Sequence, residues 1–161
     1  MAEKMLVIDP EKCTGCRTCE MVCSLKHGGG CSETRSRVRV ITQNTQDSSL
    51  PIMCQHCEIP LCQRVCPVKA TYRDMKTHAM IINKSICIGC RMCIIACPFG
   101  APSFDPIERA TIKCDLCEGD PECVKLCPTE ALKFIRADKM GIIEKRIGLE
   151  KLFKAISTVI G

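Results

Sequence analysis

Cysteine is spaced along this chain in a pattern that suits iron–sulfur chemistry. All but one of the seventeen cysteines fall into four short runs, and the run from Cys87 to Cys97 has gaps of two, two and three residues before Pro98. That spacing is typical of the ligand run for a cubane 4Fe-4S cluster, in which the fourth cysteine serves a second cluster. The other three runs are Cys13, Cys16, Cys19 and Cys23; Cys54, Cys57, Cys62 and Cys66; and Cys114, Cys117, Cys123 and Cys127.

Thiolate sulfur is the soft ligand that iron–sulfur clusters require. The four runs supply four complete ligand sets, so we predict four 4Fe-4S clusters. Structural zinc is the main inorganic alternative, because paired C-x-x-C elements also build zinc sites. Three runs end in Cys-Pro, at Pro67, Pro98 and Pro128, which favours iron. Disulfides are disfavoured because the cysteines lie in tight repeated runs, and residues 1–10 show no signal-peptide pattern.

Two residues near the first run have no place in this pattern. Cys31 fits no ligand spacing, and we interpret it as a free thiol. His27 follows Cys23 by four residues; it is either an ordinary loop histidine or a donor to a cluster sulfur, which would raise the reduction potential of that cluster.

The sequence shows no residues typical of a catalytic site. We recognise no acid–base pair and no nucleophile with its base, and a cubane with four protein ligands has no open iron for a substrate. We therefore expect a carrier of electrons with no catalytic site of its own.

The rest of the composition agrees with a core made of metal clusters. The chain has 161 residues, with no tryptophan, one tyrosine and four phenylalanines, so few large side chains can fill a core. Small domains short of apolar volume usually rely on disulfides or metals. We expect the clusters to form the core and the chain without iron to be largely unfolded.

The charge balance gives no support for nucleic-acid binding. The formal charge of +5 counts every cysteine as neutral, whereas an oxidised cubane with four thiolates is negatively charged, so four clusters would make the net charge negative. No apolar run approaches the roughly 18 residues that a membrane span needs. We predict a cytoplasmic protein with no nucleic-acid partner and no transmembrane span.

The segments between the runs predict a few short elements. Residues 5–8 are expected to form a strand, and residues 131–135 a closing strand. Residues 70–73 and 79–82 flank a polar turn and indicate a hairpin. The segment 98–113 contains three prolines and is expected to be a connection without a strand pair.

A basic alternation lies between the first and second runs. Arg35, Arg37 and Arg39 alternate with Ser36, Val38 and Val40, a two-residue period that indicates a strand with one basic face. That face is either solvated or a docking surface for an acidic partner.

The hairpin between the second and third runs bears on how the runs pair. A cysteine run, a hairpin and a second run together have the layout of a complete two-cluster ferredoxin, which leaves the first and fourth runs to form a second unit around it. The alternative pairs the first run with the second and the third with the fourth. Nested pairing gives these ligand sets: Cys13, Cys16, Cys19 and Cys127; Cys114, Cys117, Cys123 and Cys23; Cys54, Cys57, Cys62 and Cys97; Cys87, Cys90, Cys93 and Cys66.

We therefore predict an α+β fold with little regular secondary structure, in which one ferredoxin-like two-cluster unit is nested within another. The outer unit comprises residues 1–50 and 99–138, and the inner unit comprises residues 51–98. Residues 139–161 place apolar side chains at helical intervals and predict an amphipathic helix. That helix packs on its own chain, in a groove of a partner, or on a membrane surface.

The four runs resemble the four-cluster iron–sulfur subunits of the dimethyl-sulfoxide-reductase family and related polyferredoxin subunits. The resemblance rests on Cys-Gln-His-Cys-Glu at 54–58, Cys-Asp-Leu-Cys-Glu at 114–118, and Cys-Pro at 66–67 and 127–128. It implies nested pairing and an electron-transfer subunit that connects a catalytic oxidoreductase subunit with a second redox partner. Small relatives accompany tungsten aldehyde oxidoreductases, carbon monoxide dehydrogenases and hydrogenases; a tungsten or molybdenum pterin partner is favoured here. A free polyferredoxin serving several enzymes is the alternative.

Overall fold

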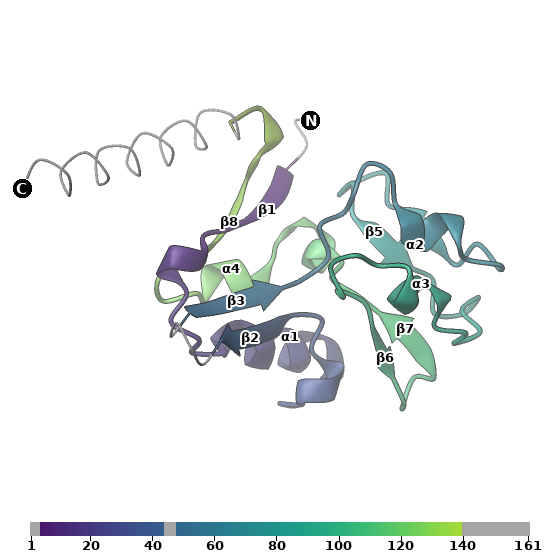
Figure 1. The fold of residues 1–161 in the computed structure, drawn as a ribbon, viewed down its shortest axis with the longest axis horizontal. Coiled ribbons are helices and arrows are strands. Elements are labelled where there is room, and N and C mark those ends of the chain that lie inside the picture. Colours follow the sequence, from purple (N-terminus) through teal and green to yellow (C-terminus); the bar gives the residue numbers. More distant parts are fainter. Residues whose placement is uncertain (1–3, 44–47, 140–161) are drawn as a thin grey trace, which may run out of the picture.

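The computed structural model describes residues 4–43 and 48–139 (Figure 1). The predicted amphipathic helix of residues 139–161 lies outside these ranges apart from its first residue. Within the described residues, no helix has the length and apolar character that crossing a membrane requires.

Four separate ribbons, each of two antiparallel strands, make up the β-structure of the described residues. The first and last strands pair with each other, β1 (Lys4–Ile8) with β8 (Leu132–Arg136). The other ribbons are hairpins of neighbouring strands: β2 (Arg39–Gln43) with β3 (Ser48–Ile52), β4 (Thr71–Arg73) with β5 (Met80–Ile82), and β6 (Ser103–Asp105) with β7 (Ala110–Ile112). The predicted α+β class with little regular structure is confirmed.

Proline sets the length of the helices. The helices α2 (Leu61–Arg64), α3 (Met92–Ile95) and α4 (Glu122–Lys125) have four residues each, and in each case a Cys-Pro pair follows within three residues. The residue before proline is disfavoured in helical conformation, so each helix ends before that cysteine. In the first run Ser24 replaces proline, and α1 (Thr18–Gly28) continues for eleven residues. Short 3-10 turns occupy Pro10–Lys12, Glu33–Arg35, Leu116–Gly119 and Ala137–Lys139.

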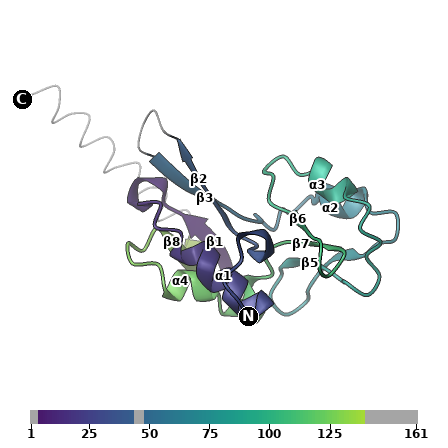
Figure 2. The ribbon, with the colours of Figure 1, turned by 90° about the horizontal axis from the view of Figure 1, so that it is seen from below.

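The elements gather into two groups (Figures 1 and 2). On one side α1 packs against α4, beside the β1–β8 and β2–β3 ribbons. On the other side α2 packs against α3, beside the β4–β5 and β6–β7 hairpins. The β1–β8 pairing thus brings the two ends of the described chain together, while the middle forms its own group. The residue limits of the two units stay a prediction.

The strands at residues 5–8 and 131–135 and the hairpin within 70–82 are confirmed to within one or two residues. The prediction for 98–113 was wrong, because β6 and β7 form a hairpin there. Its turn depends on Asp105, whose side-chain Oδ1 accepts the backbone N–H groups of Ile107 and Glu108 at 2.9 and 3.2 Å. An aspartate that binds the following backbone makes a turn by itself, so the prolines do not prevent strand pairing.

The arginines at 35, 37 and 39 do not form a free basic face. The predicted alternation holds, since Ser36, Val38 and Val40 are buried, but only the last of the three arginines lies in β2. Each arginine pairs with an acidic residue of the chain itself. The pairs are Arg35 with Asp105 at 3.3 Å, Arg37 with Asp115, and Arg39 with Glu33 at 3.3 Å. The first two pairs join distant segments, so the arginines hold the fold together and leave little charge for an acidic partner.

The main core is small and rich in cysteine. Its buried residues are Cys23, Val38, Met53, Ala79, Cys114, Leu116, Cys123 and Leu132. Side chains of both groups of elements meet in it, because Met53 and Ala79 flank the inner runs, whereas Cys23 lies on α1. A core that contains so many thiols and so few large apolar side chains fits the expectation that bound clusters complete it.

Candidate iron–sulfur sites

The four ligand loops share one backbone feature. In every C-x-x-C pair that opens a run, the residue before the second cysteine has a left-handed conformation: Gly15 (φ 71°), His56 (φ 47°), Gly89 (φ 68°) and Leu116 (φ 59°). That conformation turns the loop tightly around a central point. Glycine adopts it without strain, whereas histidine and leucine do so at a cost of about 1 kcal/mol or more. The second and fourth runs therefore adopt the same loop geometry although His56 and Leu116 disfavour a left-handed backbone conformation.

Each of the two glycines also lies against a hairpin. A β-carbon on Gly15 would come within 2.5 Å of Ser49 Oγ on β3, and one on Gly89 within 2.9 Å of the Arg109 carbonyl oxygen beside β7. In the third run Arg91 stacks over Phe104 of β6, with 4.1 Å between the guanidinium carbon and the ring centroid. The hairpin that the sequence did not reveal therefore holds the third run in place.

We expect Gly89→Ala to destabilise the cluster-loaded protein by about 1–3 kcal/mol, because it adds backbone strain and a clash with a carbonyl oxygen that cannot rotate away. The matched control is Gly100→Ala, at a residue with φ 61° and open space around the missing side chain. Loss of visible cluster absorbance on heating under anaerobic conditions measures both variants. Equal melting temperatures for the two would contradict the close approach at Gly89.

A second repeated turn follows the fourth cysteine of three runs. Lys69, Gly100 and Glu130 have left-handed φ values of 54°, 61° and 54°. Their N–H groups each donate to the carbonyl oxygen of the fourth cysteine of the run, all at 3.2 Å. The turn directs the chain away from the site. In the second run it also brings the Ala70 N–H within 3.2 Å of Cys66 Sγ.

Four cavities each bring together four cysteines, and the members come from two different runs in every case. The sets are Cys13, Cys16, Cys19 and Cys127; Cys23, Cys114, Cys117 and Cys123; Cys54, Cys57, Cys62 and Cys97; and Cys66, Cys87, Cys90 and Cys93. These groupings coincide with the four sets of the nested pairing. The alternative pairing would have required first-run and second-run cysteines in one cavity. Ligation of iron by each set stays a prediction.

The electrostatics of these cavities favour metal binding over free thiolates. Burial raises the pKa of Cys19 and of Cys123 to about 12 in each case, and burial raises the pKa of Cys114 well above its usual range. Neighbouring cysteines raise the same pKa values further, because thiolates placed close together repel one another. Iron must therefore replace protons at these sulfurs, and its positive charge removes the repulsion.

The donor groups around the cysteines fit a bound cluster. The Arg37 N–H donates to Cys23 Sγ at 3.3 Å, and the Thr18 hydroxyl donates to Cys16 Sγ at 3.4 Å. His56 accepts the Met80 N–H on Nδ1 at 2.9 Å, which puts its proton on Nε2. That Nε2 is buried and has no partner among the described residues. A buried donor without an acceptor needs an explanation, and cluster sulfur is an acceptor of the required kind.

The structure separates the two unassigned residues of the first run. Cys31 is exposed and lines none of the four cysteine cavities. His27 lines the cavity of Cys23, Cys114 and their partners, with Nε2 at 3.6 Å from Cys117 Sγ and 3.4 Å from Asp115 Oδ1. Burial lowers the pKa of His27, so the imidazole is neutral near pH 7 and carries one N–H donor.

We expect His27→Leu to lower the reduction potential of the Cys114 cluster by the equivalent of about 1 kcal/mol, a factor of about five in the reduction equilibrium. The reason is that a hydrogen bond to ligand sulfur stabilises the more negative, reduced form. His78→Leu is the control, because no hydrogen bond links the His78 ring to a cysteine within the described residues. Potentiometric titration followed by electron paramagnetic resonance measures the shift. Identical potentials in wild type and His27→Leu would assign His27 a packing role only.

Sequence reasoning did not find three other residues at these sites. They are His56, Asp115 and Lys113, of which the last donates from Nζ to Cys62 Sγ at 3.4 Å. Each lies within or directly beside a C-x-x-C pair, which is the signal that could have drawn attention to it. Their partners, however, come from segments 24 to 78 residues away, so the sequence alone does not pair them.

Comparison with known proteins gives the same result as the geometry. A family model described as a 4Fe-4S dicluster domain matches residues 45–137, and one described as a 4Fe-4S binding domain matches residues 4–25. Together these matches include all four cysteine runs. The fold and the sites therefore define a ferredoxin-type carrier of 4Fe-4S clusters.

The chain belongs to the 4Fe-4S dicluster family, and its relatives are iron–sulfur electron-transfer subunits of oxidoreductase complexes. It is 38% identical over 133 residues to the aliphatic sulfonate oxidoreductase polyferredoxin-like subunit of Pyrococcus furiosus, covering 81% of this chain and 76% of the relative. It is 35% identical over 153 residues to a subunit of the anaerobic dimethyl sulfoxide reductase of Escherichia coli, covering 83% and 73%. The resemblance predicted from the cysteine motifs is confirmed.

A solved structure also matches along nearly the whole chain. It is the active site complex BamBC of benzoyl coenzyme A reductase with 1,5-dienoyl-CoA, with a TM-score of 0.50 and 28% identity over 96% of this chain and 92% of that one.

A further relative, 33% identical over 165 residues, is the thiosulfate reductase electron transfer subunit PhsB of Salmonella typhi, with 93% of this chain and 84% of the relative covered. Like these relatives, the protein is an iron–sulfur electron-transfer subunit.

Proposed function

We propose that the four cysteine sets hold four 4Fe-4S clusters, and that the protein conducts electrons between a catalytic oxidoreductase subunit and a second redox partner. The observation that carries the proposal is the grouping of cysteines from different runs around four cavities. Each cluster, when bound, accepts and releases one electron. The chain supplies the ligands, the donors to sulfur and the spacing between neighbouring sites.

Short helices connect neighbouring sites within each unit. Cys19 and Cys23 are one turn apart on α1, so a single helix contributes to two sites. Likewise α2 contains Cys62 and ends two residues before Cys66. Ligands one helical turn apart lie about 6 Å from each other along the axis, which supports direct electron exchange between the two clusters of a unit.

Buried contacts connect the two units. Cys54 packs against the core that contains Cys23 and Cys114, and it lies close enough to help raise the pKa of Cys114. The Cys54 set and the Cys114 set are therefore the neighbouring sites at the junction. We infer a linear order of four sites that begins at the Cys13 set, passes through the Cys114 and Cys54 sets, and ends at the Cys87 set.

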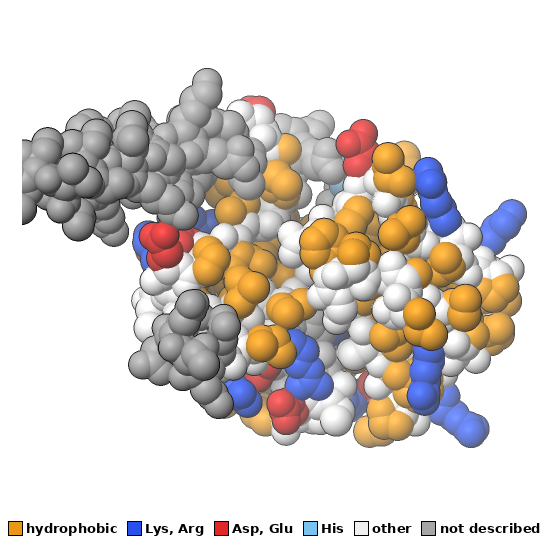
Figure 3. All heavy atoms as spheres, viewed as in Figure 1, with side chains coloured by type: hydrophobic (Ala, Val, Ile, Leu, Met, Phe, Trp, Pro, Cys, Tyr) orange, Lys and Arg blue, Asp and Glu red, His pale blue; other side chains and the backbone are white. Residues whose placement is uncertain are grey.

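An apolar surface surrounds the inner sites. Ile59, Leu61 and Phe99 line the cavity of the Cys54 set and are 63%, 45% and 48% exposed. Figure 3 shows hydrophobic side chains gathered over the side where α2 and α3 lie, with lysine and arginine around them. Apolar surface of this kind next to a redox site supports docking of a protein partner. One end of the proposed path would then meet that partner.

The catalytic partner that we favour is a tungsten or molybdenum pterin subunit in the cytoplasm. Support comes from the resemblance to the dimethyl-sulfoxide-reductase family and from relatives that are named as subunits of sulfonate, thiosulfate and dimethyl sulfoxide oxidoreductases. Anaerobic native purification followed by metal and pterin analysis tests this directly. Recovery of a larger complex containing pterin would support it. An isolated monomer without a stable partner would favour a free polyferredoxin instead.

We expect anaerobically purified protein to contain about sixteen iron and sixteen inorganic sulfide per chain, the content of four cubanes. The measurement is chemical analysis of iron, sulfide and zinc on the same sample. About four zinc per chain without sulfide would point to a structural zinc protein. About half of the expected iron would show that one unit carries no clusters.

A further inference from the structure

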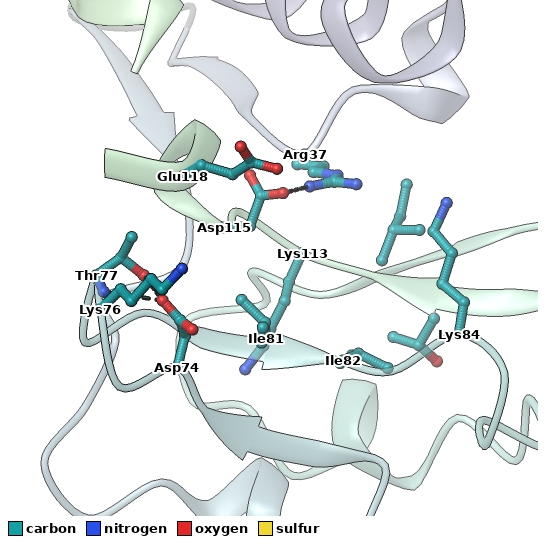
Figure 4. A pocket seen from close by; sticks show the side chains of 12 residues that line it. Arg37, Asp74, Lys76, Thr77, Ile81, Ile82, Lys84, Lys113, Asp115 and Glu118 are labelled. Carbon is teal, nitrogen blue, oxygen red and sulfur yellow. Dashed lines mark hydrogen bonds and ion pairs between the residues drawn. The ribbon is translucent and has the colours of Figure 1, made fainter. Parts of the chain in front are cut away.

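Lys113 is a buried cation that points at a cluster ligand. It follows β7 directly and is 3% exposed. Within the described residues its Nζ makes one hydrogen bond, to Cys62 Sγ at 3.4 Å. Figure 4 shows the side chain running alongside Ile81, away from the Arg37–Asp115 pair. Although Cys62 is 51 residues away in the sequence, it is the group that this ammonium contacts.

The carboxylates near Lys113 have other partners. Lys113, Asp74 and Asp115 line a common cavity of about 590 Å³. Asp115 pairs with Arg37, and Asp74 accepts the N–H and the hydroxyl of Thr77 at 2.8 and 2.6 Å. No ion pair links Lys113 to an acidic residue in the part of the chain that the structure describes. A charge buried without a counterion is strongly unfavourable, so Lys113 needs a different anion.

The Cys54 set supplies that anion if it holds a cluster. Lys113 lines the cavity of Cys54, Cys57, Cys62 and Cys97 as well as the larger mixed-charge cavity. A cubane bound by four thiolates carries net negative charge, and reduction adds one more. The ammonium is therefore placed to stabilise the reduced form more than the oxidised form.

Arg17 and Arg37 line the cavities of two other sites, but within the described ranges neither side chain donates a hydrogen bond to a cysteine sulfur. The donors that reach the sulfurs of the other three sites are the Arg37 and Ala70 backbone N–H groups, the Thr18 and Thr129 hydroxyls and the neutral His27 ring. Among the described residues, Lys113 alone donates a hydrogen bond to a cysteine sulfur from a positively charged side chain. Hydrogen bonds that involve a charged group are about twice as strong as neutral ones.

We propose that Lys113 sets the reduction potential of the cluster held by Cys54, Cys57, Cys62 and Cys97, and raises it relative to the same site with a neutral residue. The inference rests on the proposed ligation of that set. Lys113 does not bind the iron itself but acts on the cluster through its hydrogen bond to Cys62. Because Coulomb interactions weaken with distance, the neighbouring clusters should change less.

The test is a potentiometric titration of anaerobic protein, with dithionite as reductant and electron paramagnetic resonance as readout. We expect Lys113→Met to lower the reduction potential of one of the four clusters by at least about 59 mV. For a one-electron couple this corresponds to a tenfold change in the equilibrium constant for reduction. Lys113→Arg, which keeps the charge, should shift that potential by less than half as much. Lys76→Met is the matched control, because Lys76 lines the same large cavity and makes no hydrogen bond to a cysteine within the described residues.

The outcomes separate this inference from the proposed function. A full iron and sulfide content with unchanged potentials in Lys113→Met would overturn the role of Lys113 and leave the clusters intact. Absence of clusters in the wild-type protein would overturn the proposed function itself. If Lys113→Met does not retain its clusters, Lys113→Gln is the second variant, because it keeps a neutral hydrogen-bond donor at the same place. Lys113→Gln should also lower the reduction potential of this cluster. An unchanged, wild-type potential in Lys113→Gln would contradict the inference. The cluster whose reduction potential changes in Lys113→Met must be the one that Cys97→Ala removes. A change in the potential of a different cluster would contradict the inference.

Discussion

Replacement of Cys97 by alanine is expected to remove the cluster of the second cysteine run, although Cys97 belongs to the third. The reason is that Cys97 lines the cavity of Cys54, Cys57 and Cys62, whereas Cys66 from the second run lines the cavity of Cys87 and its neighbours. Iron content should fall by about one quarter, because one of four cubanes loses a ligand. Iron and sulfide analysis with Mössbauer spectroscopy measures the loss.

Double variants identify which cluster is lost. If Cys62 and Cys97 serve one cluster, Cys62→Ala combined with Cys97→Ala should lose no more iron than Cys97→Ala alone. If Cys90 serves a different cluster, Cys90→Ala combined with Cys97→Ala should lose about twice as much. The reverse result would show that the fourth cysteine stays with its own run. Cys31→Ala is the control and should leave the iron content unchanged, because that thiol is exposed and outside the four cavities.

Removal of iron is expected to unfold most of the chain. The helices α2, α3 and α4 have four residues each, far below the length at which a helix is stable alone. Every sheet among the described residues is a two-stranded ribbon, which is marginal in water without further packing. Three of the buried residues of the main core are the thiols Cys23, Cys114 and Cys123, so the core loses its centre when the clusters leave.

Circular dichroism and amide hydrogen exchange measure this effect after anaerobic treatment with an iron chelator and a thiol reductant. We expect loss of most exchange protection, including that of the β1–β8 ribbon. Refolding should require iron and sulfide together, because binding and folding are coupled at such sites. A chelated protein that keeps its exchange protection would show that the apolar core is sufficient without clusters.

The sequence predicted those parts of the fold that depend on local chemistry. Cysteine spacing gave the ligand sets to be tested, and short apolar segments gave β1, β4, β5 and β8. These signals lie within a few residues of one another. They suffice because ligand loops and hairpins are made by neighbouring residues.

The sequence did not predict what depends on distant partners. The β6–β7 hairpin was missed because one aspartate, Asp105, makes its turn in a segment where prolines suggested a connection. The left-handed conformations of His56 and Leu116 were missed because neither residue favours them. The pairing of Arg37 with Asp115 and the direction of Lys113 depend on contacts across 78 and 51 residues. No local pattern encodes which partner such a side chain finds.

The pairing of β1 with β8 has a consequence for how the protein matures on the ribosome. On the proposed ligand assignment, the Cys54 and Cys87 sets are complete once Cys97 has been synthesised, while the Cys13 set lacks its last ligand until Cys127 and β8 emerge. Domains fold as units during synthesis when their contacts become available. Cluster delivery would therefore proceed from the middle of the chain outward, and the three thiols that are made first would wait longest for iron and stay exposed to oxidants for longest.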